Sequence, residues 1–111
     1  MLKVLIVDDE ATNLELLHHV IDWQALGFRV VGTALDGEEG LDVYERTRPD
    51  VILVDIRMPV MDGLAFIREI RRTDALVKLI ILSAHADFEY ARQAIEYGIH
   101  AYLLKPVNEH K

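Results

Sequence analysis

The fold of this chain is decided by the stretch PDVILVDIRMPVMDGLAFI at residues 49–67. Four unbroken apolar residues, 51–54, lead directly into Asp55, and a short polar loop follows before apolar residues recur at helical spacing from Leu64. This pattern predicts a buried strand that delivers a carboxylate to its C-terminal end. Because ligands of open parallel sheets sit outside the carboxyl ends of the strands, Asp55 is the first candidate for a functional residue.

Strands and helices are expected to alternate along the rest of the chain. The patterns predict strands over residues 2–7, 28–35, 51–54, 79–82 and 101–104, and helices over about 11–25, after Asp36, after Asp62, and over about 87–97. Segment 28–35 is the least uniformly apolar, which suits an edge strand. The alternation predicts an α/β fold with a doubly wound parallel sheet and helices on both of its faces.

Local signals suggest how the helices begin and pack. Asp62 can cap the helix that follows it, before the apolar stripe that starts at Leu64. Thr12 and Glu15 have the spacing of a capping box at the start of the first helix. Asp9 or Glu10 could instead begin this helix one turn earlier. In the last helix, the apolar side chains expected to face inward are Phe88, Ala91 and Ile95.

Composition limits the functions that the chain can have. A chain of 111 residues forms one domain, here 1–111, and its net charge of −7 argues against direct nucleic-acid binding. The absence of cysteine excludes disulfides and thiolate metal sites. The sequence shows no signal peptide and no apolar run long enough to span a bilayer, so we expect a cytoplasmic domain without membrane contact.

A sheet of this type would normally gain a last helix from the residues after 104. Only residues 107–111 remain to build it, and we expect this chain to be the N-terminal part of a longer regulator or to be covered by a partner chain.

Polar residues stand at the ends of four of the predicted strands: Asp8, Asp9, Asp55, Ser83 and Lys105. Parallel strands bring these ends to one edge, where neighbouring carboxylates repel one another by about 4 kcal/mol per pair at ~4 Å and an effective dielectric constant near 20. A hard divalent cation relieves this repulsion, and Mg²⁺ suits a shallow site with few carboxylates. An aspartate beside Mg²⁺ is a competent nucleophile toward phosphorus.

Four motifs in chain order, VDDE, DIRMPVMDG, ILSAH and YLLKP, resemble the CheY-like receiver domain of two-component response regulators. The resemblance implies a flavodoxin-like sheet of order 2-1-3-4-5. It also implies a signalling domain, not an enzyme, in which Asp55 accepts a phosphoryl group from a sensor histidine kinase. By the same resemblance, the Mg²⁺ ligands are Asp9, Asp55 and the backbone carbonyl of Arg57, and Asp8 holds a metal-bound water.

The resemblance further implies a phosphoryl-binding and switching set: Ser83, Tyr102 and Lys105, with a cis peptide bond between Lys105 and Pro106. On this basis we expect phosphorylation to alter a face built from the fourth helix and fifth strand, through which a homodimer forms. Residues 21–28 and 87–107 resemble receivers joined to AraC-type helix-turn-helix output domains, which implies control of transcription by another part of the protein.

Two other functions are consistent with parts of the pattern. A haloacid-dehalogenase-like phosphatase also uses an aspartate nucleophile with Mg²⁺. Such an enzyme has a second acid two residues after the nucleophile, which protonates the leaving group. In this chain Arg57 occupies that position and cannot act as the acid. A phosphorylation-independent interaction module would keep the fold and lose the chemistry. Since every expected site residue is present, the phosphoacceptor remains the preferred interpretation.

Overall fold

The computed structural model describes residues 1–56, 58, 60–83 and 88–104, without the side chain of Phe88. Within this part of the chain, five parallel strands form one sheet in the order β2-β1-β3-β4-β5, which confirms the predicted topology. The strands are β1 (Leu2–Val7), β2 (Phe28–Ala34), β3 (Val51–Val54), β4 (Lys78–Ser83) and β5 (Ala101–Leu104). The helices are α1 (Ala11–Val20), α2 (Gly37–Thr47), α3 (Gly63–Thr73) and α4 (Phe88–Glu96).

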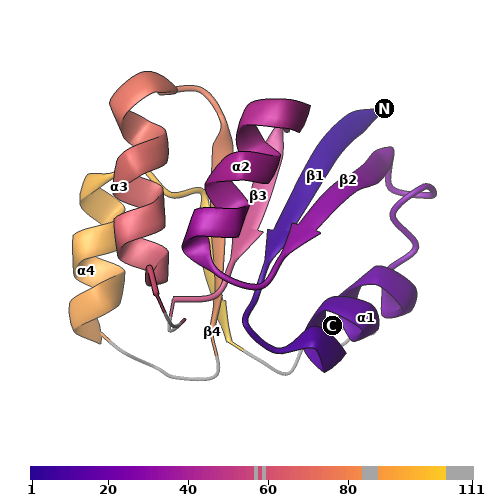
Figure 1. Cartoon of the computed structure of the whole chain (residues 1–111), viewed down its shortest axis with the longest axis horizontal. Helices are drawn as coiled ribbons and strands as arrows, with labels where there is room; N and C mark the ends of the chain where they lie inside the picture. Colours follow the sequence, from indigo (N-terminus) through magenta and orange to yellow (C-terminus); the bar gives the residue numbers. More distant parts are fainter. Residues whose placement is uncertain (57, 59, 84–87, 105–111) are drawn as a thin grey trace.

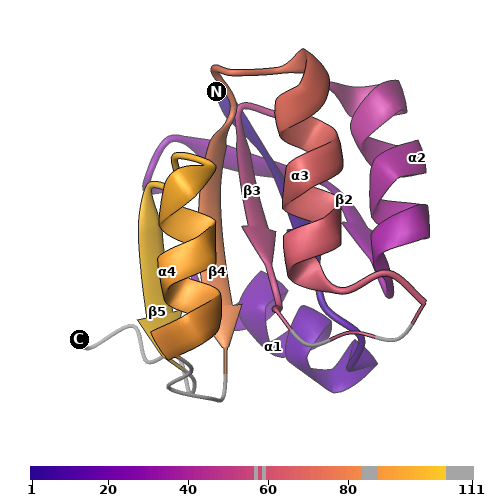
Figure 2. The ribbon, with the colours of Figure 1, turned by 90° about the vertical axis from the view of Figure 1, so that its left-hand side faces the viewer.

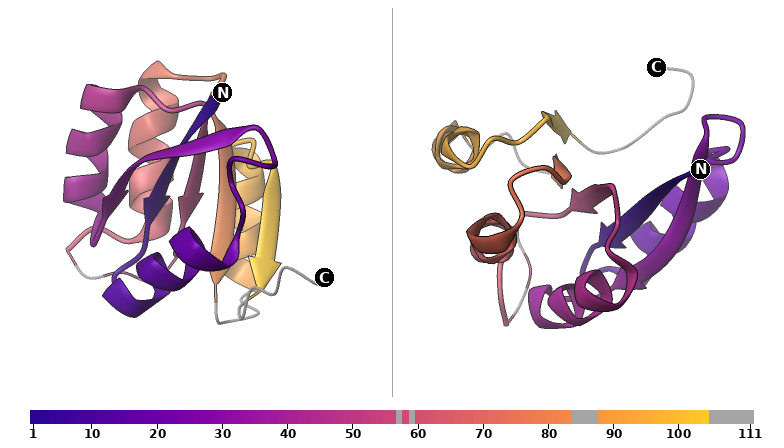
Figure 3. Two further views of the ribbon diagram at one scale, coloured as in Figure 1. Left: turned by 90° about the vertical axis from the view of Figure 1, so that its right-hand side faces the viewer. Right: turned by 90° about the horizontal axis from the view of Figure 1, so that it is seen from above.

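Helices cover both faces of the sheet. Figure 1 shows α2, α3 and α4 side by side, and Figure 2 places them on one face, with α1 behind the sheet. The view from above in Figure 3 separates the same two layers. Because every strand is parallel and every crossover helix returns to the start of the next strand, the helices begin near the edge where the strands end. We call this edge, which carries Asp8, Asp55 and Ser83, the carboxyl edge.

The core consists of two apolar layers, one on each side of the sheet. One lies under α2, α3 and α4 and includes Phe66 and Ile67, and the other lies under α1 and includes Leu14 and Leu17. Residues 51–54 of β3 are at most 8% exposed, as expected of a strand covered on both faces. None of the described helices is long and apolar enough to cross a bilayer.

Aspartates begin two of the helices that follow strands. Oδ1 of Asp36 accepts a hydrogen bond from the Glu39 amide across 2.8 Å, and Oδ1 of Asp62 accepts one from the Ala65 amide across 2.9 Å. Each carboxylate satisfies an amide that has no partner within the helix and lies at the positive end of the helix dipole. The predicted cap at Asp62 is therefore confirmed.

The capping box predicted at Thr12 is wrong. The alternative start at Glu10 is confirmed: this residue, two positions before Thr12, is the N-cap of α1, and no side chain makes a capping hydrogen bond there. The carbonyl of Glu10 accepts the amides of Asn13 and Leu14 at 3.0 and 3.2 Å. Thr12 is thus already inside the first turn, where its hydroxyl cannot act as the cap.

The first helix also ends earlier than the predicted residue 25. Ile21 has an extended backbone (φ −94°, ψ 127°), and the amide of Trp23 donates to the carbonyl of Ile21. The indole Nε1 of Trp23 donates to the carbonyl of Leu17 across 3.1 Å. The side chain therefore satisfies one of the last carbonyls of α1, and the apolar residues beyond Val20 belong to a packed turn.

The predicted inward face of α4 is wrong at Ile95, and the side chain of Phe88 lies outside the described residues. Ile95 is 68% exposed, whereas Ala94 is fully buried, with Tyr90 and Tyr97 packed against the core beside it. Ala91 is only half-buried. A small residue at 94 lets the helix approach the sheet and leaves the two tyrosine rings to fill the flanks, a choice that apolar periodicity does not reveal.

Candidate functional site at the carboxyl edge

Two buried carboxylates lie at neighbouring strand ends. The residues Val7 and Val54 are register partners in the parallel pair β1·β3, so the residues that follow them, Asp8 and Asp55, are neighbours. The amide of Asp55 donates to the carbonyl of Val7 across 2.9 Å, which ties the two strand ends together. Asp8 is 2% and Asp55 7% exposed. Burial of two acids this close requires compensating positive charge or hydrogen bonds.

Three consecutive acids after β1 form an acidic cluster. One carboxylate oxygen from each of Asp8, Asp9 and Glu10 lies within 4.8 Å of the other two. Asp8 is buried and the other two are exposed, and Oδ1 of Asp8 accepts the Glu10 amide across 3.0 Å. Oxygen ligands on a half-open rim are the donor set that Mg²⁺ or another hard divalent cation requires. The residues present therefore fit such an ion.

The sequence patterns did not predict that Glu10 belongs to the acidic cluster. They indicated this residue only as a possible start of the first helix. Its carboxylate turns back toward those of Asp8 and Asp9 because the chain bends from strand to helix at this point. The run of three acids at the end of a strand was the sequence signal for this cluster. It was not used because neighbouring side chains point to opposite faces in an extended strand, so Glu10 was not expected beside Asp9.

The end of β4 supplies a buried hydroxyl. Ser83 is fully buried and pairs in register with Leu104, the last residue of β5. Tyr102 pairs with Ile81 and is half-buried against the core. Lys105 follows Leu104 in the sequence, and it lies outside the described residues together with Arg57 and Pro106. The predicted cis peptide, lysine contact and carbonyl ligand thus remain predictions.

The start of α3 lies close against the backbone of Asp55 and Ile56. The amide of Gly63 donates to the carbonyl of Ile56 across 2.9 Å. A Cβ on Gly63 would lie 2.5 Å from the carbonyl oxygen of Asp55 and 2.7 Å from Cα of Ile56. No side chain fits there, so this glycine determines how closely the start of α3 approaches the candidate acceptor.

A second close contact supports the same loop from α2. A Cβ on Gly37, the first residue of α2, would lie 2.7 Å from Cβ, Cγ and the carbonyl oxygen of Met61. Just before Met61, Val60 has φ of 69° and is 74% exposed. Since a β-branched residue rarely adopts this backbone conformation, the loop holds Val60 under strain.

The fold and the site define a class of protein: an open, doubly wound α/β domain with an acidic pocket at the carboxyl edge of its sheet. The family model "Response regulator receiver domain" matches residues 4–111, and the chain belongs to this family of two-component signalling domains.

Relatives and solved structures agree with this membership. The chain is 38% identical over 109 residues to the "Uncharacterized transcriptional regulatory protein YesN" of Bacillus subtilis, covering 98% of this chain and 30% of YesN. It is 40% identical over 108 residues to the transcriptional regulatory protein HptR of Staphylococcus aureus, covering 97% of this chain and 42% of HptR. The chain therefore spans less than half of the length of these two curated relatives.

Among solved structures, the receiver domain of AraT, a response regulator from Geobacillus stearothermophilus, superposes with a TM-score of 0.90 at 41% identity, covering 96% of this chain and 83% of that one. The CheY in a complex with CheX, BeF₃ and Mg²⁺ from Borrelia burgdorferi superposes with a TM-score of 0.87 at 29% identity, covering 96% and 80%.

Proposed function

We propose that this receiver domain is a phosphoacceptor in which Asp55 takes a phosphoryl group from the phosphohistidine of a sensor histidine kinase. The observation that carries the proposal is the burial of Asp55 next to Asp8 at adjoining strand ends, with the acidic cluster on its rim. A carboxylate in this position reaches the crevice where ligands of open parallel sheets bind.

The transfer requires positioning more than covalent machinery. A carboxylate oxygen of Asp55 attacks phosphorus, the phosphorus–nitrogen bond of the phosphohistidine breaks, and its electron pair returns to the imidazole. Asp9, Asp55 and the carbonyl of Arg57 would hold Mg²⁺, with Asp8 acting through a bound water. The ion would neutralise charge on the phosphoryl oxygens.

The hydroxyl of Ser83 and the ammonium of Lys105 are the proposed partners of the bound phosphoryl group, and Tyr102 is the proposed switch aromatic. Ser83 is the buried end of β4, so its shift toward new oxygens would move the strand end that precedes α4 in the chain. The face of α4 and β5 would change and bind a second copy. Its exposed apolar side chains support this idea: Ile95 is 68% and Leu103 48% exposed.

The output of the signal would lie elsewhere in a longer, cytoplasmic protein. Both curated relatives described above are transcriptional regulatory proteins, and this chain covers 30% of one and 42% of the other. We therefore propose that residues 1–111 are the receiver part of a transcriptional regulator with an AraC-type output domain. DNA contact by that domain would leave this acidic one free of nucleic acid.

Phosphorylation with acetyl phosphate and Mg²⁺, followed by intact-mass spectrometry, tests the proposal. The wild type is expected to gain one phosphoryl group per chain and to lose it slowly, and Asp55→Asn to gain none. Asp42→Asn, at an exposed acid on α2, is the matched control and should behave as wild type. Continuous release of phosphate would indicate a phosphatase, and no reaction would indicate an interaction module. If Ser83→Ala left phosphorylation-dependent association unchanged, the proposed switch would be wrong.

A further inference from the structure

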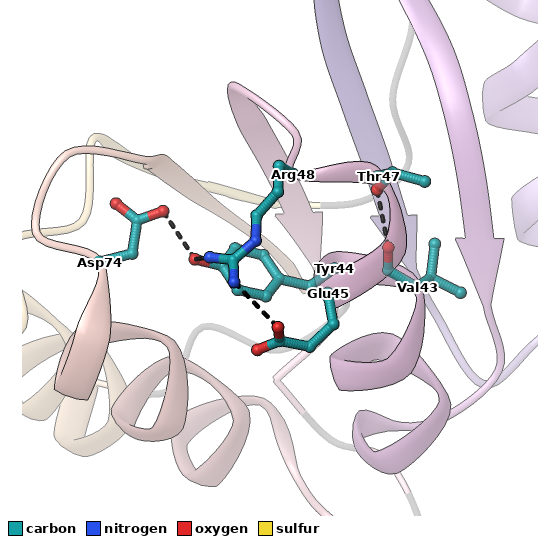
Figure 4. Close-up of polar contacts among 6 residues, drawn as sticks. All are labelled: Val43, Tyr44, Glu45, Thr47, Arg48 and Asp74. Atoms are coloured by element: carbon teal, nitrogen blue, oxygen red, sulfur yellow. Dashed lines mark hydrogen bonds and ion pairs between the residues drawn. The ribbon is translucent and has the colours of Figure 1, made fainter.

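The helices α2, α3 and α4 are joined by polar contacts at the end of the molecule opposite the carboxyl edge. The hydroxyl of Tyr44, near the end of α2, donates to Oδ2 of Asp74, the C-cap of α3, across 2.7 Å. Nη1 of Arg48 donates to the same hydroxyl across 3.2 Å, as Figure 4 shows. Asp74 in turn accepts the amides of Leu76 and Val77 at 2.9 and 3.0 Å, so the loop after α3 is well ordered by hydrogen bonds.

Arg71 extends these contacts to α4. In the last turn of α3, its Nε donates to the carbonyl of Tyr97 across 2.7 Å and its Nη2 to that of Gly98 across 3.0 Å. Its Nη1 donates to the carbonyls of Val77 and Asp74 at 2.8 and 3.1 Å. One planar guanidinium thus joins the loop after α3 to the turn that follows α4, and an ammonium group cannot reproduce this fork.

The environment of Arg71 shields these bonds from water only in part. Its side chain is half-buried, and desolvation lowers the pKa of the guanidinium, against the opposing effect of the Asp74 carboxylate. Hydrogen bonds from a charged donor to carbonyls are stronger than those from a neutral donor. The C-terminal end of α4 is therefore tightly held to α3.

The other end of α4 faces the carboxyl edge. Ser83 ends β4, and α4 begins at Phe88 after the short connecting segment 84–87. A helix of this length moves as a stiff body, and hinges lie at the residues that end an element. With its last turn held by Arg71, a change at the end of β4 would therefore displace the first turn of α4 more than its last.

We propose that Arg71 is a positioning residue that fixes the C-terminal end of α4 at Tyr97 and Gly98, so that α4 turns about this end when the carboxyl edge changes state. The anchoring is a property of the unphosphorylated domain. Its use in switching rests on the proposed function, because phosphorylation is the event that would move the first turn.

Hydrogen exchange in the unphosphorylated protein tests the anchor. Arg71→Ala is expected to speed the exchange of amides in residues 95–101 roughly tenfold, because local opening no longer breaks these bonds. Arg71→Lys should act in the same direction with a smaller effect. Arg72→Ala is the matched control, since Arg72 adjoins Arg71 and, among the described residues, pairs with Glu69 alone, at 3.0 Å on the exposed surface. Equal exchange in all three variants would overturn the proposal, and Arg71→Lys decides it if Arg71→Ala does not fold.

The turning of α4 is tested by the same measurement after treatment with acetyl phosphate and Mg²⁺. The experiment is run at a protein concentration at which the phosphorylated chain stays monomeric, so that binding of a second copy does not protect the face of α4 and β5. In the wild type, phosphorylation should then change exchange in residues 88–94 and leave 95–101 unchanged, and in Arg71→Lys the change should spread to both segments. Equal changes at both ends of α4 in the wild type would overturn the pivot. If the wild type were not phosphorylated, the proposed function and the pivot would both fall. The anchor would still be decided by the unphosphorylated variants.

Discussion

Gly63 approaches the backbone of Asp55 so closely that an added Cβ would lie 2.5 Å from the Asp55 carbonyl oxygen. The backbone of Ile56 limits the same space, since its Cα would lie 2.7 Å from that Cβ. Both contacts are with main-chain atoms, which cannot rotate away as a side chain can. The position of the candidate acceptor is therefore coupled to the start of α3.

Gly63→Ala is expected to displace the backbone around Asp55, lower the free energy of unfolding by about 1–3 kcal/mol, and slow phosphorylation. Gly27→Ala is the control, because Gly27 has φ of 86° and open space around it. The Gly27→Ala variant should lose about 1 kcal/mol of unfolding free energy from backbone strain alone and keep the wild-type phosphorylation rate. Urea denaturation and intact-mass kinetics measure the two effects, and an unchanged rate in Gly63→Ala would contradict the coupling.

Glu10→Gln is expected to weaken Mg²⁺ binding roughly fivefold to tenfold, because one of three clustered carboxylates loses its charge. Isothermal titration calorimetry measures the affinity. Glu15→Gln, at an exposed acid within α1, removes the same charge away from the cluster and should leave the affinity near wild type. Equal losses in both variants would mean that Glu10 contributes only to the overall field.

Tyr44→Phe should lower the free energy of unfolding by about 1–2 kcal/mol, since Asp74 loses a buried hydrogen-bond donor. Tyr97→Phe is the matched control, because its hydroxyl makes no hydrogen bond to the described part of the chain, and it should change stability by less than about 0.5 kcal/mol. Chemical denaturation compares the two. Similar losses would show that ring packing, and not the bond to Asp74, accounts for the effect.

The hydrogen bonds of Asp74 also predict acid sensitivity. Burial alone raises the pKa of this carboxyl, but hydrogen bonds from Tyr44, Val77 and Leu76 and the charge of Arg71 outweigh it, so the net pKa is lowered. A lowered pKa in the folded state contributes stability above the ordinary value of about 4, and this stability is lost as the pH falls through the folded pKa. The stability advantage of wild type over Asp74→Asn should therefore shrink below about pH 4. The exposed-site control Asp42→Asn should show no such trend in denaturation curves, and an advantage independent of pH would contradict the assignment.

At high pH the same contact predicts a second loss of stability. Burial, followed by the hydrogen bond and charge of Asp74, raises the pKa of Tyr44. A raised pKa in the folded state contributes stability that is fully present below the ordinary value of about 10 and is lost as the pH rises through the folded pKa. Tyr44→Phe should remove this alkaline loss, which denaturation above about pH 10 would detect.

Val60→Asn is expected to raise the free energy of unfolding by about 0.5–1 kcal/mol, because asparagine tolerates the φ of 69° that strains valine. The exposed Val60 side chain has little burial to lose. Leu76→Asn makes a comparable change at a residue that is 91% exposed and lacks positive φ. Leu76→Asn should not raise the free energy of unfolding. A lower free energy of unfolding for Val60→Asn would show that Val60 makes favourable contacts.

Much of the fold followed from local patterns. Residues 51–54 read as a strand buried on both faces, and they are one. The cap at Asp62 was predicted from its position before an apolar helical stripe, and its carboxylate does accept the Ala65 amide. These features depend on residues within a few positions of each other, so periodicity and hydrogen-bonding type suffice to predict them.

Errors arose where a particular side-chain contact, and not the apolar period, sets the geometry. The end of α1 depends on the indole of Trp23 reaching back to Leu17, and the inward face of α4 depends on how closely Ala94 can approach the sheet. Neither is encoded in the apolar period of the helix itself. A hydrogen bond from the Trp23 side chain accompanies the first, and side-chain volume against the sheet decided the second.

The amino-acid sequence by itself determined the alternation of strands and helices, the order of the polar strand ends, and the placement of Asp55 after a buried strand. These follow from residue type and spacing along one chain. Only the tertiary structure decided that Glu10 joins the acidic cluster, that Gly63 limits the approach to Asp55, and that Arg71 binds four carbonyls from two separate loops. These contacts depend on how the packed helices and strands bring separate turns together. No local sequence pattern specifies the distances between those turns.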